Sequence, residues 1–108
     1  MMKRIFWLLA LLFVAPVLAD ENLPAVTMYK NPACDCCGAW AEHLQAAGFT
    51  RLQSHAAHDL SATRRTLGMP EVYASCHTAK IGQYLFEGHV PAADIKRLLR
   101  EHPDAIGL

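Results

Sequence analysis

The sequence has no excess of basic residues, because 10 Lys and Arg are balanced by 10 Asp and Glu among its 108 residues. Neutralising the phosphates of a nucleic acid requires a basic patch, so we expect no nucleic-acid partner. Internal repeats and low-complexity linkers are also lacking. A chain of this length provides for one folded domain and no more.

The longest apolar run is too short for a membrane-spanning helix. It covers residues 5–17, whereas a helix that crosses a bilayer needs about 20 apolar residues. The run follows a short basic start and leads into residues 17–19, which suit a signal peptidase. This pattern predicts a cleaved signal peptide over 1–19, no stable membrane anchor, and one mature periplasmic domain over 20–108. Cleavage leaves 8 basic against 10 acidic residues, a net charge of −2 with histidines neutral.

The apolar patterning after the signal predicts the order strand, helix, strand, helix, strand, strand, helix. The expected strands cover 25–29, 49–55, 77–81 and 84–88, and the expected helices begin near Cys36, Asp59 and Pro91. Gly82-Gln83 is expected to join the last two strands as a hairpin, whereas residues 71–75 are ambiguous. This order is that of a thioredoxin or glutaredoxin-like α/β domain, with a small mixed sheet and flanking helices.

Three of the four cysteines, Cys34, Cys36 and Cys37, fall within four positions where the first strand meets the first helix. A helix start favours a thiolate, which can attack a disulfide or bind a soft metal. Cys34 and Cys37 have the C-x-x-C spacing of a dithiol oxidoreductase, but such an enzyme does not require a third sulfur. Clustered thiolates suit copper(I). Four cysteines allow three disulfide pairings, and the sequence does not choose among them.

The fourth cysteine, Cys76, is followed directly by His77, and imidazole is the commonest metal ligand among side chains. The predicted hairpin starts the third strand near His77. We therefore expect Ser75-Cys76 beside the first three cysteines, with the Cys76 sulfur within reach of a shared ion and His77 as the nearest histidine. If Pro70 filled that place instead, Cys76 would lie roughly 20 Å away along an extended strand.

Several motifs extend over nearly all of the mature chain. They are Tyr29-Lys30-Asn31-Pro32 with the three cysteines, Trp40, His43-Leu44, Gly48-Phe49, Ser75-Cys76-His77-Thr78-Ala79 and Glu87-Gly88-His89-Val90-Pro91. Together they resemble a family long known as a domain of unknown function, which includes the CopG-type periplasmic copper-resistance proteins. The resemblance implies a thioredoxin-like fold and copper bound by Cys34, Cys36, Cys37, Cys76 and His77. Many relatives continue past the position of Leu108 into a Gly-, Pro- and Met-rich tail, so no tail contact is assumed here.

These observations predict a periplasmic copper(I)-binding protein of copper resistance, with a multi-copper cluster as one form of the site. Its expected partners are copper ions and other periplasmic copper-handling proteins. The alternative function is a thiol–disulfide oxidoreductase using Cys34 and Cys37, and a copper-linked redox reaction would combine the two. Whether the protein is an enzyme stays open. A zinc-stapled structural domain is a weaker hypothesis, because three sulfurs from one short loop would strain a tetrahedral shell.

Overall fold

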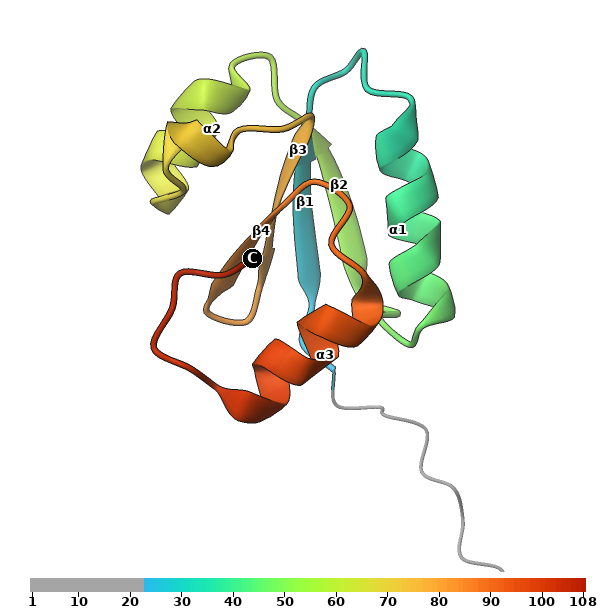
Figure 1. The fold of residues 1–108 in the computed structure, drawn as a ribbon. Helices are drawn as coiled ribbons and strands as arrows, with labels where there is room; N and C mark the ends of the chain where they lie inside the picture. The colour runs from blue at the N-terminus through green and yellow to red at the C-terminus, as the bar shows by residue number, and fades with distance from the viewer. Residues whose placement is uncertain (1–22) are drawn as a thin grey trace, which may run out of the picture.

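The computed structural model describes residues 23–108, so the predicted signal over 1–19 lies outside the described residues. The helices and strands follow the predicted order β-α-β-α-β-β-α (Figure 1). They are β1 (Val26–Lys30), α1 (Cys36–Ala46), β2 (Leu52–Ala56), α2 (Leu60–Leu67), the 3-10 helix η1 (Glu71–Tyr73), β3 (His77–Ile81), β4 (Tyr84–Glu87) and α3 (Ala92–Glu101). Within 23–108, no helix combines the length and apolar character needed to cross a membrane.

The four strands form one mixed sheet in the order β2-β1-β3-β4. β1 and β2 are parallel, as a connection through the crossover helix α1 allows. β3 is antiparallel to both β1 and β4. In this register Lys30, the last residue of β1, lies opposite His77, the first residue of β3. The end of β1, the start of α1 and the start of β3 therefore meet at one end of the sheet, across its strands, and all four cysteines lie there.

The core forms where apolar faces of the helices pack on the sheet. Its fully buried side chains include Met28 and Phe86 from the strands, Leu44 from α1 and Ile95 from α3. The predicted helix starts and the hairpin are confirmed: Asp59 caps α2 by accepting from the Ala62 N–H at 3.0 Å. Residues 71–75, which the sequence left ambiguous, contain η1.

The second strand differs from its prediction, because β2 begins at Leu52 rather than at Phe49. Phe49 is fully buried without belonging to a strand. Its N–H donates to the Leu44 carbonyl at 3.0 Å, after a turn in which Gly48 adopts φ +105°. Phe49 is therefore held against the C-terminal turn of α1 and is not part of β2. β2 itself lies at the edge of the sheet and is mostly exposed, so its sequence carries little apolar alternation.

Candidate metal centre

The loop between β1 and α1 is tied to the residue that precedes β3. The Asn31 side-chain oxygen accepts from the Ala33 N–H at 3.0 Å, and the Asn31 carbonyl accepts from the Cys34 N–H at 2.9 Å. Asparagine favours such local turns because its side chain bonds the backbone two residues on. The Asn31 N–H in turn donates to the Cys76 carbonyl at 3.2 Å. The backbone of Cys76 therefore adjoins the cysteine loop.

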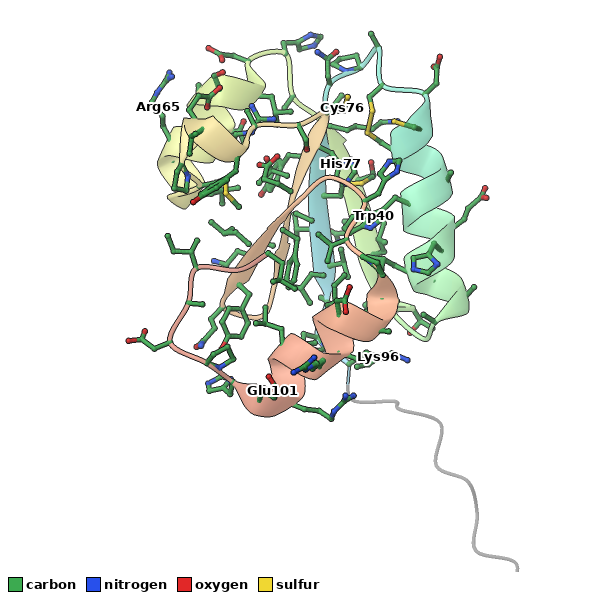
Figure 2. All side chains as sticks on the ribbon, viewed as in Figure 1. Trp40, Arg65, Cys76, His77, Lys96 and Glu101 are labelled. Carbon is green, nitrogen blue, oxygen red and sulfur yellow. A yellow bond between two sulfur atoms is a disulfide. The ribbon has the colours of Figure 1, made fainter. Side chains whose placement is uncertain are left out.

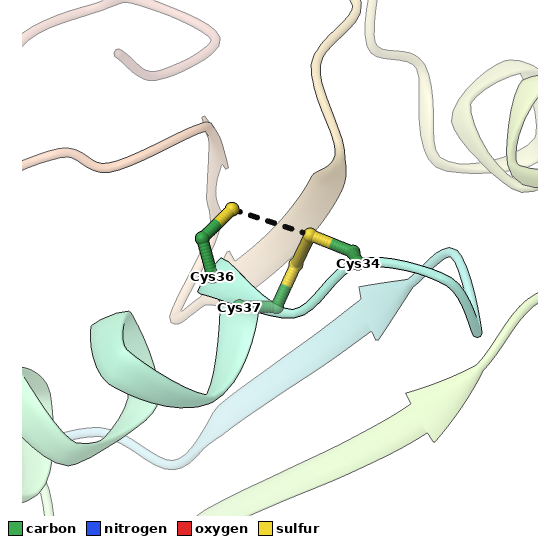
Figure 3. A group of neighbouring side chains, drawn as sticks. All are labelled: Cys34, Cys36 and Cys37. Atoms are coloured by element: carbon green, nitrogen blue, oxygen red, sulfur yellow. Dashed lines mark hydrogen bonds between the residues drawn. A yellow bond between two sulfur atoms is a disulfide. The ribbon is translucent and has the colours of Figure 1, made fainter.

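Cys34, Cys36 and Cys37 gather at the start of α1 (Figure 3). Cys34 and Cys37 form a disulfide, while Cys36 and Cys76 are free, so the structure has one bridge and none of the three complete pairings. The Cys36 sulfur lies 3.5 Å from that of Cys34, and all three sulfurs lie within 4.8 Å of one another. Cys37 is fully buried, Cys34 is half-buried and Cys36 is exposed. The cluster therefore opens to solvent on its Cys36 side.

His77 faces the buried side of this cluster. Its Nε2 lies 2.8 Å from the Gly88 carbonyl, and because a carbonyl only accepts, Nε2 carries the proton. In the neutral ring the lone pair is then on Nδ1, which lies 3.3 Å from the Cys37 sulfur. Burial lowers the pKa of His77, against a smaller opposing effect of the Gly88 hydrogen bond. The ring is therefore held in the neutral form, in which imidazole binds metals.

Two rings cover His77 and account for its burial. The Trp40 ring lies with its centroid 4.6 Å from that of His77, and the His89 ring stacks at 5.6 Å. The Trp40 indole N–H donates to the Val90 carbonyl at 2.9 Å, which joins α1 to the segment after β4. Figure 2 shows the labelled Trp40 and His77 beside α1. His77 is thus fully buried beside the rings of Trp40 and His89.

Cys76 lies directly before β3, where the predicted hairpin register puts it, and its thiol is exposed and free. Within residues 23–108, its sulfur does not belong to the group of three that lie within 4.8 Å of one another. Cys76 and Cys34 both line one hollow of about 440 Å³, which the start of α2 also borders. The structure thus brings the Cys76 backbone to the loop, and an ion shared by all four sulfurs stays a prediction.

Sequence reasoning missed a buried ion pair behind Cys76. Arg64 of α2 and Glu87 of β4 have side chains only 4% and 5% exposed, and Arg64 Nε donates to Glu87 Oε1 at 3.0 Å. Glu87 belongs to a motif that the sequence singled out. For Arg64 the sequence offered one indication of burial. It follows the apolar Leu60 by four residues, which places both on the same face of α2.

Comparison with known proteins identifies the family. Residues 73–108 match the model of a family described as "Protein of unknown function, DUF411". Two solved structures, described as copper resistance protein CopG in Form 1 and Form 2, are 42% and 43% identical to the chain. They cover 79% and 78% of it with TM-scores of 0.71 and 0.70. The chain belongs to the CopG-type copper-resistance family.

The family assignment confirms the resemblance that the motifs indicated. The matched segment 73–108 contains both the Ser-Cys-His-Thr and the Glu-Gly-His-Val-Pro motifs. The chain spans 66% of the length of each solved CopG structure, just under two thirds. No curated protein has a significant match to the chain.

Proposed function

We propose that the protein is a periplasmic copper(I)-binding protein of copper resistance, exported by the signal over 1–19 and functioning through one domain over 20–108. The observation that carries the proposal is the cluster of Cys34, Cys36 and Cys37 beside the unprotonated nitrogen of His77. Thiolates and imidazole suit copper, whereas carboxylates suit harder ions. Among residues 23–108, the cluster contains sulfur donors and no carboxylate. The copper resistance proteins to which the chain is similar support the same metal.

The donor set fits copper once the disulfide is reduced, because metal binding requires deprotonated thiols. The sulfurs of Cys34 and Cys36 lie 3.5 Å apart, and two sulfurs bound to one ion with ~2.3 Å bonds are roughly 4 Å apart. Reduction frees the sulfurs of Cys34 and Cys37, and the free thiol of Cys76, which lines the same hollow as Cys34, would supply the fourth thiolate. Because thiolates bridge ions, the proposed site includes a multi-copper cluster. The proposed partners are copper ions and other periplasmic copper-handling proteins.

Copper(I) titration of the reduced mature protein, in competition with a coloured copper(I) chelator, tests this function. We expect the wild type to bind copper(I) in preference to zinc. Cys36→Ser should have a lower copper capacity, and tight copper binding should be lost when all four cysteines are replaced by serine. Cys36 is exposed, so Cys36→Ser should keep the fold, as circular dichroism would show. Binding to the wild type that is no tighter than to the variant without cysteines would contradict the proposal.

The disulfide favours a second candidate function. Cys34 and Cys37 are already paired, and half-buried Cys34 is the more accessible of the two sulfurs. A thiol–disulfide oxidoreductase would use this pair and could dispense with Cys36. In an insulin-reduction assay, such an enzyme would lose turnover in Cys34→Ser and keep it in Cys36→Ser. If Cys36→Ser also kept full copper loading, the oxidoreductase would replace the copper-binding function as the better account.

A further inference from the structure

The carboxylate of Glu87 is surrounded by donors that come from both sides of Cys76. Its Oε1 accepts from Arg64 Nε at 3.0 Å and from the Thr78 hydroxyl. Its Oε2 accepts from the Ser75 N–H at 3.0 Å and lies 2.9 Å from the Ser75 hydroxyl. Glu87 therefore holds the residue before Cys76 and the residue after His77.

Arg64 completes the attachment of Ser75. Its Nη2 donates to the Ser75 carbonyl while its Nε is paired with Glu87. The N–H and the carbonyl of Ser75 are thus both held by the ion pair, through Glu87 and Arg64 respectively. A planar guanidinium can make both contacts at once, which a lysine ammonium at this position cannot do in the same geometry.

The cost of burying these charges indicates a role beyond stability. A buried ion pair is often no more stabilising than apolar side chains of similar volume, because both charges are removed from water. Here Arg64, Glu87 and Thr78 are all withdrawn from solvent, and their contacts converge on the segment 75–78. This arrangement fixes the backbone on both sides of Cys76, whose side chain is exposed.

We propose that Arg64 and Glu87 are positioning residues for Cys76, and that the pair presents the Cys76 thiolate to the Cys34–Cys37 loop as a copper ligand. This inference rests on the proposed copper-binding function. Residues that orient metal ligands typically change metal affinity by about 10- to 100-fold when they are replaced. Arg64 sits on α2, which contributes none of the predicted ligands, and reaches the Cys76 segment through the Ser75 carbonyl and through Glu87.

The test is a double-mutant cycle on the reduced protein. Copper(I) affinity is measured by chelator competition for wild type, Arg64→Lys, Cys76→Ser and the double variant. Arg64→Lys keeps a positive charge beside Glu87 but removes the Nη2 that donates to the Ser75 carbonyl. We expect Arg64→Lys to weaken copper(I) binding about tenfold when Cys76 is present, and less than about twofold in the Cys76→Ser background, because residues that act through one another are not additive.

A matched control and a metal-free measurement accompany the cycle. Arg97 forms an exposed ion pair with Glu101, at 2.8 Å, so Arg97→Lys should leave copper affinity unchanged. In metal-free protein, amide hydrogen exchange should show loss of protection at the Ser75 N–H in Arg64→Lys and not in Arg97→Lys. If Arg64→Lys fails to fold, Thr78→Val, which removes a single hydroxyl donor to Glu87, enters the same cycle under the same criterion.

The outcomes separate this inference from the function on which it rests. An equal loss of affinity in both backgrounds, or no loss when Cys76 is present, overturns the positioning role while Cys76 remains a ligand. If Cys76→Ser binds copper(I) as tightly as wild type, Cys76 is not a ligand, and both that part of the proposed function and the positioning role are wrong.

Discussion

The burial of His77 predicts how the stability of the oxidised, metal-free protein depends on pH. The side chain is fully buried, and desolvation lowers its pKa below the ordinary 6.5. The charges of His89 and Arg64 act in the same direction, while the Gly88 carbonyl and Glu87 oppose them. Above pH 6.5 the ring is neutral in both the folded and the unfolded chain. Below pH 6.5 the unfolded chain binds a proton that the folded protein does not, so stability falls as the pH falls.

The size of the effect follows from the single proton involved. One group changes the free energy of unfolding by at most about 1.4 kcal/mol per pH unit. The loss should begin near pH 6.5 and continue until the pH passes below the folded-state pKa of His77. Urea denaturation followed by circular dichroism between pH 8 and pH 5 measures this slope.

His77→Gln provides the decisive comparison. Glutamine can donate to the Gly88 carbonyl as Nε2 does but does not titrate, so the variant should be less stable overall and lose less stability on acidification. The exposed His58 supplies a matched control, and His58→Gln should keep the wild-type slope. A slope in His77→Gln as steep as that of wild type would refute the argument, because the proton uptake would then belong to other groups.

Two further substitutions test the surroundings of the site. Trp40→Phe leaves the Val90 carbonyl without its 2.9 Å indole donor, and should lower the free energy of unfolding by about 1–3 kcal/mol in denaturant titration; an unchanged midpoint would show that this contact does not hold α1 to the loop. In Gly107→Ala the added methyl group would overlap the Leu85 carbonyl, so the C-terminal residues should detach from β4. The Glu87 N–H donates to the Leu108 carbonyl at 3.0 Å, so amide exchange at Glu87 should accelerate. Retained protection there would mean that the chain end adapts to the added methyl group.

The sequence was sufficient where local chemistry determines the structure. Gly82 between two apolar runs predicted the β3–β4 hairpin, and the hairpin in turn placed the start of β3 at His77. It was insufficient for β2, because an exposed edge strand needs little apolar alternation and the strongly apolar Phe49 packs after a helix end. The residues of this segment gave no way to predict that β2 begins at Leu52 and not at Phe49.

The candidate site shows the same division between local and distant determinants. The spacing of Cys34, Cys36 and Cys37 predicted their gathering, because four successive positions at a helix start cannot lie far apart. The predicted register placed His77 at the start of β3, but alternation along a strand left open which way its side chain faces, so its contact with Cys37 is known only from the structure. Arg64 lies 23 residues before its partner Glu87, and no local pattern links the two. Such a pair becomes visible only once α2 and β4 are packed together.

The disulfide links the two candidate functions instead of separating them. With Cys34 and Cys37 joined, the free thiols among residues 23–108 are Cys36 and Cys76, both exposed. Reduction by two electrons adds two thiols, one of them beside the His77 lone pair. The number of sulfur donors thus doubles with the redox state of a single bond, while the fold that carries His77 and Cys76 need not change. Under the proposed copper-binding function, any thiol exchange at Cys34 would therefore alter how much copper the site can hold.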